Sequence, residues 1–245
     1  MYSNIRIEIE NDYQAMSQKG AQIFSQMMKK HPQKAFGFAT GSTPIGMYQE
    51  LIRMHKEDNL DFSGISTFNL DEYHPIGQES EHSYYYFMQQ ELFEHVNTDS
   101  TRTFFMDGRT KDPALEAQAY EKKITDAGGI TMQILGIGLN GHIGFNEPSD
   151  SFEASARQIA LAEVTIESNA RHFSNPDDVP RHAITLGIHA IMMAKHIILL
   201  ANGKAKASIL RDALLGPITP LVPASILQLH PSVVVVTDKE AAALL

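Results

Sequence analysis

Apolar runs of strand length alternate with helical segments along the chain. The apolar runs cover residues 35–39, 65–70, 102–106, 132–136, 197–201 and 233–237, and several are continuous. A continuous apolar run of this length is typical of a strand that is covered on both faces. Between the runs, apolar residues recur with helical spacing over residues 12–30, 44–57, 83–96, 113–127, 187–195 and 204–215. We therefore predict six strands and six helices in βαβα order.

This order predicts an α/β fold with an open, mostly parallel β-sheet and helices on both faces, a modified Rossmann-like sandwich. The 245 residues fit one hydrophobic core, because single cores stop growing at about 250 to 300 residues. We expect a single domain over residues 1–245, with its site at the carboxyl ends of the strands. The least regular stretch, 148–181, contains three prolines. Such a segment inside a compact domain is more often a lid or binding loop than a linker, so we expect a lid there.

Composition and charge narrow the class of protein. Hydrophobic residues make up 43% of the chain and charged residues 20%, which is typical of a globular protein. The formal net charge is −9 and no lysine or arginine cluster is present, which argues against a nucleic-acid partner. No stretch reaches about 18 consecutive apolar residues, so we expect no membrane association. The chain has no cysteine and no secretory signal at its start, and we expect a cytoplasmic protein without disulfides or thiolate metal sites.

A first candidate site follows the apolar run 35–39. Gly41 permits a sharp turn, Ser42 or Thr43 can cap the next helix, and Pro44 suits its first position. Backbone amides and hydroxyl groups at a helix start suit a phosphate group. The alternative is a capped helix start that binds no ligand. The spacing of a Walker phosphate loop is absent.

A pair of carboxylates, Asp71 and Glu72, ends the second apolar run. At a strand end, partial burial and a like-charged neighbour can tune one carboxylate as a general base. Asp71 is closer to the strand end and is our candidate for the base. The alternative is that Asp71 caps the next element while Glu72 is exposed to solvent.

The segment 136–148 contains four glycines in nine residues, followed by a proline. Its G-x-G-x-x-G spacing suggests a dinucleotide site, but a later glycine and proline interrupt the helix that such a site requires. Asn140 and Gly141 are also a hairpin signal. The glycines indicate backbone close to a ligand, where His142 can move protons at neutral pH and Glu147 can orient its imidazole.

Cations complete the set of candidates. Arg171 can bind a phosphate with two hydrogen bonds, and Lys204 and Lys206 open a helix after the run 197–201. Each of them, taken alone, is better explained as an ordinary solvated charge. The chain contains no HExxH motif and no His and Asp residues at ligand spacing, so we predict no metal site.

Several segments together resemble the glucosamine/galactosamine-6-phosphate isomerase family. The resemblance covers nearly the whole chain and is carried by residues 39–44, 68–73, 83–85, 141–148 and 227–231. It implies conversion of glucosamine 6-phosphate and water to fructose 6-phosphate and ammonia, without metal or organic cofactor. Galactosamine 6-phosphate is the alternative substrate, because motifs do not report the stereochemistry at C4. The related 6-phosphogluconolactonases have a similar glycine loop but are not expected to share its continuation.

The resemblance also implies roles for individual residues. Asp71 would move the proton between C2 and C1 of the open-chain sugar, and His142 would open the ring with help from Asn140 and Glu147. The 6-phosphate would be held by Gly41, Ser42, Thr43, Arg171 and Lys206. Lys206 is preferred to Lys204 because its distance of ten residues to Gly216 matches the family pattern. A silent sugar-phosphate-binding regulator would not need the three acid and base residues, so we favour an enzyme.

Two departures from the family pattern affect these expectations. Many members carry Asp where this chain has Asn140, so either Glu147 is the main partner of the imidazole or Asn140 holds it by hydrogen bonding. The long allosteric members have a basic residue where this chain has Ile159, and a C-terminal extension that is absent here. We expect a monomer or small homo-oligomer that binds a small-molecule sugar phosphate and is not activated by N-acetylglucosamine 6-phosphate.

Overall fold

The computed structural model describes residues 5–169, 173, 175 and 179–245. The strands are β1 (Ile5–Glu10), β2 (Ala35–Phe38), β3 (Ser66–Asn69), β4 (Asp71–His74), β5 (Thr103–Phe104), β6 (Ile130–Gly136), β7 (Arg157–Ala160), β8 (His182–Thr185), β9 (His196–Ala201) and β10 (Val233–Asp238). The α-helices are α1 (Tyr13–Lys30), α2 (Ile45–Asp58), α3 (Tyr84–Glu91), α4 (Pro113–Asp126), α5 (Glu163–Asn169), α6 (Ile188–Met192) and α7 (Ala207–Leu215). The 3₁₀ helices include η1 (Phe93–His95), η2 (Ser100–Arg102), η5 (Lys204–Lys206) and η6 (Pro223–Leu229).

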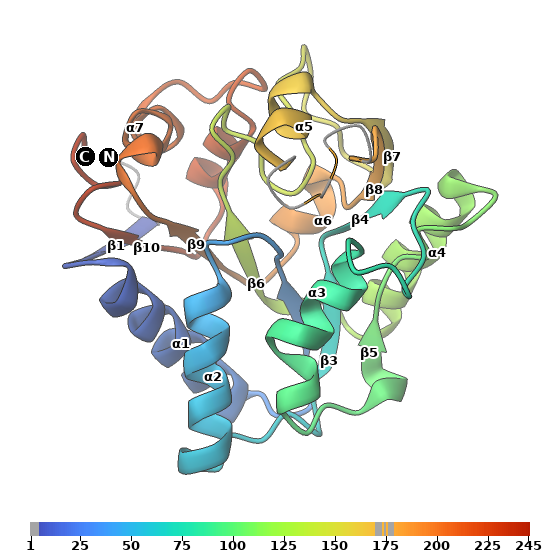
Figure 1. Cartoon of the computed structure of the whole chain (residues 1–245). Helices are drawn as coiled ribbons and strands as arrows, with labels where there is room; N and C mark the ends of the chain where they lie inside the picture. Colours follow the sequence, from blue (N-terminus) through green and yellow to red (C-terminus); the bar gives the residue numbers. More distant parts are fainter. Residues whose placement is uncertain (1–4, 170–172, 174, 176–178) are drawn as a thin grey trace.

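Seven strands form one parallel sheet in the order β1-β10-β9-β6-β2-β3-β5. Every residue of β2 and β10 is buried, as their continuous apolar sequence predicts for strands covered on both faces. Helix α1 packs on β1, β9 and β10, and Figure 1 shows α1 and α2 on one side of this sheet and α7 on the other. The predicted α/β fold with a mostly parallel sheet is confirmed.

The order of the strands contains one reversal. From β2 the chain proceeds outward to β3 and β5, whereas from β6, the other neighbour of β2, it proceeds to β9 and β10 on the opposite side. The loops that follow β2 and β6 therefore leave the sheet in opposite directions. A crevice opens between them at the carboxyl ends of the strands, as at the switch point of other open α/β sheets.

A second, three-stranded sheet is antiparallel, in the order β4-β8-β7. A single residue, Leu70, lies between the end of β3 and the start of β4, so the chain passes directly from the large sheet into the small one. In this register Asp71 lies opposite Thr185, and Glu72 lies opposite Ile184. The small sheet thereby fixes the backbone of both carboxylates.

All six predicted strands and all six predicted helices are present, with differences at their ends. The run 102–106 pairs only over β5, the helix predicted over 83–96 is α3 followed by η1, and the helix predicted over 204–215 begins as η5. The sequence analysis missed β1, β4, β7, β8 and α5. Two of these, β7 and α5, lie in the stretch 148–181, which is more regular than we predicted, and a lid there stays a prediction. No helix in the described part of the chain has the length and apolar character needed to span a bilayer.

The start of α2 differs from its prediction. Pro44 occupies the N-cap position rather than the first helical position, and its side chain makes no capping hydrogen bond. The Tyr13 hydroxyl from α1 accepts a hydrogen bond from the Gly46 amide at 2.8 Å and donates one to the Ser42 carbonyl at 3.1 Å. The Thr43 hydroxyl donates to Asn202 at 2.9 Å, so the predicted capping by Thr43 is wrong, and capping by Ser42 stays a prediction.

Candidate active site

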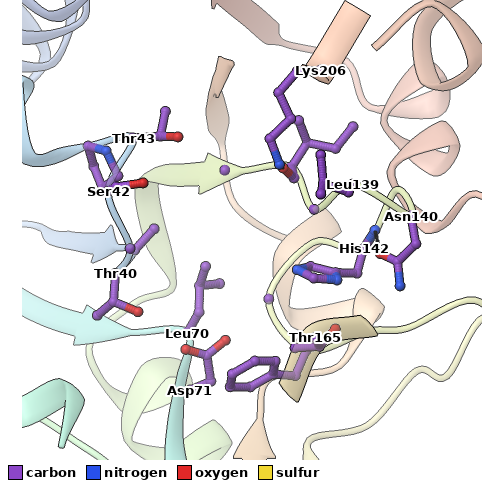
Figure 2. A pocket seen from close by; sticks show the side chains of 18 of the residues that line it. Thr40, Ser42, Thr43, Leu70, Asp71, Leu139, Asn140, His142, Thr165 and Lys206 are labelled. Carbon is purple, nitrogen blue, oxygen red and sulfur yellow. Dashed lines mark hydrogen bonds between the residues drawn. The ribbon is translucent and has the colours of Figure 1, made fainter. Parts of the chain in front are cut away.

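A cavity of about 640 Å³ lies at the carboxyl ends of β2, β3, β6 and β9. The predicted site residues that line it are Gly41, Ser42, Thr43, Asp71, Asn140, His142 and Lys206. Figure 2 shows Ser42 and Thr43 on one side of the cavity, His142 and Asn140 on the other, and Asp71 between the two sides. Glu147 does not line the cavity but contacts the imidazole of His142. Arg171 lies outside the described residues. The fold therefore brings together segments that are far apart in the sequence.

Asp71 presents a buried carboxyl group to this cavity. Its residue is only 7% exposed, and no described residue donates a hydrogen bond to its carboxyl oxygens. Burial, followed by the negative charge of Glu72, raises the pKa of Asp71 to about 8. A carboxyl group with a pKa near neutrality can both accept a proton and return it.

Glu72 is buried as well, but its carboxylate has three hydrogen-bond donors. The backbone N–H groups of Tyr73, Tyr84 and Tyr85 donate to it at 2.9, 2.8 and 2.9 Å. Tyr84 and Tyr85 open α3, so the carboxylate satisfies free amides at a helix start, where negative charge is stabilised. Burial raises the pKa of Glu72, and the three amides act against it and leave it at about 7. The alternative that Asp71 caps the next element and Glu72 is solvated is wrong, because Glu72 meets the helix and Asp71 meets the cavity.

Three side chains of the loop after β6 form one hydrogen-bonded group. His142 Nδ1 lies 3.3 Å from Glu147 Oε2, and Asn140 Nδ2 donates to the same oxygen at 2.5 Å. The Asn140 carbonyl oxygen accepts from the backbone N–H of His142 at 3.2 Å. Asn140 thus contacts the backbone of His142 and the carboxylate of Glu147, whereas Glu147 contacts the imidazole. Of the two alternatives left by the sequence, this geometry favours Glu147 as the partner of the ring.

The charge state of Glu147 follows from its surroundings. Burial by itself raises the pKa of Glu147, but the hydrogen bond and charge of His142, with bonds from Thr165 and Asn140, outweigh it and lower the pKa below its usual value. An ionised carboxylate at Nδ1 favours the tautomer with the proton on that nitrogen. The other nitrogen, Nε2, then carries a lone pair.

Two glycines of this loop make room for the side chains of His142 and Asp71. A Cβ atom at Gly138 would lie 2.3 to 2.5 Å from three atoms of the His142 ring, so the imidazole rests directly on the backbone there. A Cβ atom at Gly144, where φ is +55°, would lie 3.4 Å from Asp71 Oδ2. The sequence analysis expected backbone close to a ligand, and the structure shows backbone close to the protein's own acid and base groups.

On the phosphate side, Lys206 and Lys204 are in different environments. Lys206 lines the cavity and its Nζ donates to the carbonyl of Ile137 at 2.6 Å, whereas Lys204 is exposed and does not line the cavity. Both lie on η5, and Figure 2 shows the side chain of Lys206 directed toward the loop after β6. The structure therefore supports the preference for Lys206 that the family pattern indicated.

The cavity residues that the sequence analysis missed include Tyr84, Thr165 and Asn202. Asn202 accepts a hydrogen bond from Thr43 Oγ1 at 2.9 Å and so connects the loop after β2 to the end of β9. Its position directly after an apolar run was a signal that could have identified it. In the residues that the structure describes, no three His, Cys, Asp or Glu side chains gather closely enough to hold a metal ion.

Comparison with known proteins places the chain in a family. Residues 10–236 match the family described as glucosamine-6-phosphate isomerases/6-phosphogluconolactonase. The chain belongs to this family. A protein of Halothermothrix orenii named glucosamine-6-phosphate deaminase is 48% identical to it over 241 residues, which are 98% of this chain and 100% of the relative. The resemblance seen in the sequence is confirmed.

Solved structures agree with this assignment. A structure described as a monomeric glucosamine-6-phosphate deaminase is 41% identical, with a TM-score of 0.96 over 98% of this chain and 100% of the other. A 6-phosphogluconolactonase from Trypanosoma cruzi has a TM-score of 0.76 over 100% of this chain and 98% of the other, at 20% identity. The second likeness shows the shared fold alone.

The buried carboxyl group of Asp71 predicts a pH-dependent cost in stability. The folded-state pKa of about 8 lies above the value of about 3.9 for an unfolded Asp, so ionisation destabilises the fold as pH rises from about 4 through 8. Asp71→Asn removes that cost. We expect the variant to have a higher free energy of unfolding than the wild type at pH 8.5, by at least about 1 kcal/mol, and a smaller difference at pH 4. Urea unfolding at both pH values measures this, and an equal difference at both would contradict it.

Proposed function

We propose that this protein is a glucosamine-6-phosphate deaminase, which converts glucosamine 6-phosphate and water to fructose 6-phosphate and ammonia. The observation that carries the proposal is the unpaired, buried carboxyl group of Asp71 in the same cavity as an imidazole held by Glu147. The reaction needs one group that opens the sugar ring and another that moves a proton between two carbons. The names of two relatives, 48% and 41% identical to this chain, support the same activity.

His142 opens the sugar ring in this proposal. With its Nδ1 proton directed to Glu147, the lone pair on Nε2 accepts the proton of the O1 hydroxyl and delivers it to the ring oxygen. The bond between C1 and the ring oxygen breaks, and C1 becomes an aldehyde. Glu147 stabilises the imidazolium that exists between the two transfers.

Asp71 carries out the isomerisation. The new aldehyde acidifies the proton on C2, and the ionised carboxylate removes it while a proton of the substrate's ammonium group passes to O1, which gives an enolamine. The carboxyl group returns its proton to C1, which leaves an iminium group at C2. Water adds to this iminium group, ammonia leaves as ammonium, and C2 becomes the ketone of fructose 6-phosphate. A pKa of about 8 suits both halves of this transfer.

The 6-phosphate positions the sugar for these steps. In the proposal, it is held by the loop of Gly41, Ser42 and Thr43 together with Lys206, and by Arg171 outside the described residues. The phosphate is remote from C1 and C2, so its binding energy can place C2 against Asp71. Because these side chains supply the proton transfers, the proposed reaction uses no metal ion and no organic cofactor.

Four accompanying properties are expected with this function. We expect a monomer, by analogy with the relative described as monomeric. We expect no activation by N-acetylglucosamine 6-phosphate, because Ile159 stands where the allosteric members are expected to have a basic residue. Ile159 packs against a small apolar cluster that includes Tyr73 and Phe145. A cytoplasmic location and a lid over residues 148–181 stay predictions from the sequence.

The direct test is ammonia release from glucosamine 6-phosphate and galactosamine 6-phosphate, each with and without EDTA and N-acetylglucosamine 6-phosphate. We expect release from the gluco substrate, unchanged by either addition, and none from the Asp71→Asn variant. A preference for the galacto substrate would move the assignment to its isomerase. Absence of ammonia from both sugars would refute the proposal.

The raised pKa of Asp71 also predicts the pH dependence of the reaction. Because the base acts when ionised, kcat/KM should fall on the acid side with an apparent pKa of about 8. Separate titration of the substrate's amine and phosphate groups distinguishes their pKa values from that of the enzyme. A profile that stays flat from pH 8.5 down to pH 5, after correction for the substrate, would contradict the assignment of Asp71.

The two neighbouring lysines offer a matched pair of variants. Lys206→Ala removes a cation from the cavity and should raise KM by about 10- to 100-fold, since a charge-assisted hydrogen bond contributes about 1.5 to 3 kcal/mol. Lys204→Ala removes the same charge from an exposed position, and its KM should stay within about twofold of the wild type. Steady-state kinetics measure both, and equal effects of the two substitutions would exclude a specific phosphate contact by Lys206.

A further inference from the structure

The two carboxylate oxygens of Glu147 have different partners. Oε2 faces His142 Nδ1 and accepts a hydrogen bond from Asn140. Oε1 accepts a hydrogen bond of 2.5 Å from the hydroxyl of Thr165, a residue 18 positions further along the chain. The carboxylate is therefore held from both sides, by its own loop and by a separate element.

Thr165 is buried where it makes this contact. The residue is only 3% exposed, lies on α5 and lines the same cavity as His142. Figure 2 shows it beneath the imidazole on the side of Asp71. Its hydroxyl is the one polar group of a threonine side chain, so the bond to Glu147 depends on that group alone.

The second bond restricts how the carboxylate of Glu147 can rotate. The terminal torsion of a glutamate side chain is broad, and rotation about it would turn the oxygens away from the imidazole. A donor on Oε1 holds this torsion and leaves Oε2 directed at Nδ1 of His142. The orientation and tautomer of the imidazole then depend on a hydroxyl group that does not touch it.

We propose that Thr165 is a positioning residue, which acts through Glu147 to hold His142 in the orientation and tautomer needed for ring opening. The inference rests on the proposed function for the step that His142 performs. The hydrogen-bond arrangement itself does not depend on which sugar phosphate binds.

Two substitutions at Thr165 separate positioning from other roles. Thr165→Val keeps the shape but removes the hydroxyl, and we expect kcat to fall by about tenfold or more while KM stays within about threefold. Thr165→Ser keeps the hydroxyl and should restore most of kcat. Thr131→Val is the matched control, because Thr131 is equally buried and its hydroxyl has no hydrogen-bond partner among the described residues. The control should have the kcat and KM of the wild type.

A measurement without substrate tests the same inference independently of the activity. In ¹⁵N spectra of the imidazole groups, assigned with His142→Gln, the wild type and Thr165→Ser should show His142 with the proton on Nδ1. Thr165→Val should show a mixture of tautomers. This result would support the inference about Thr165 even if the wild type released no ammonia. Absence of ammonia release would refute only the proposed function.

Three results would overturn the inference. Wild-type kcat in Thr165→Val, with an unchanged His142 spectrum, would show that Glu147 needs no second partner. A rise in KM at constant kcat would make Thr165 a substrate contact instead. An equal loss of kcat in Thr165→Val and Thr165→Ser would indicate a packing role.

Discussion

The parallel pairing of β2 with β6 is the constraint on which the site depends. At Gly37 the side chain of Gln133 in β6 fills the space of a missing side chain, because a Cβ atom there would lie only 1.9 Å from the Gln133 side-chain oxygen. Because the chain leaves these strands in opposite directions, the loop that carries Ser42 and Thr43 diverges from the loop that carries His142. The cavity is the space between the two loops. Without this pairing, the groups proposed to bind phosphate and to open the sugar ring would not face the same ligand.

Two adjacent carboxylates acquire different properties because they lie on a strand. Successive side chains of β4 point to opposite faces, so Asp71 reaches the cavity and Glu72 reaches the start of α3. Three amide donors compensate the buried charge of Glu72, whereas no described residue donates a hydrogen bond to Asp71. Burial therefore leaves Glu72 as a group that stabilises the start of α3 and gives Asp71 the more strongly raised pKa. The stability lost by burying Asp71 accompanies the basicity that proton transfer requires.

Glu147 is the centre of the acid and base group. It receives hydrogen bonds from Asn140 and Thr165 and faces the imidazole of His142. From the family resemblance, the sequence analysis expected an acid in many members at the position where this chain has Asn140. Here the Asn140 amide donates a hydrogen bond to Glu147 and does not compete with Glu147 for the imidazole of His142. Glu147 is therefore the carboxylate that pairs with His142. An amide in place of an acid at this position is therefore compatible with the proposed chemistry.

The sequence by itself determined six of the seven strands of the large sheet, six helices and the family, and it supplied the candidate acid and base residues, because these depend on local periodicity and on short motifs. It did not determine the small sheet, since β4, β7 and β8 are short and their pairing is set by contacts between distant segments. The tertiary structure alone decided that Glu72 rather than Asp71 meets the start of α3, that Tyr13 contacts the start of α2, and that Thr165 meets Glu147. Each of these depends on where a side chain points after folding, and residue type and spacing do not carry that information.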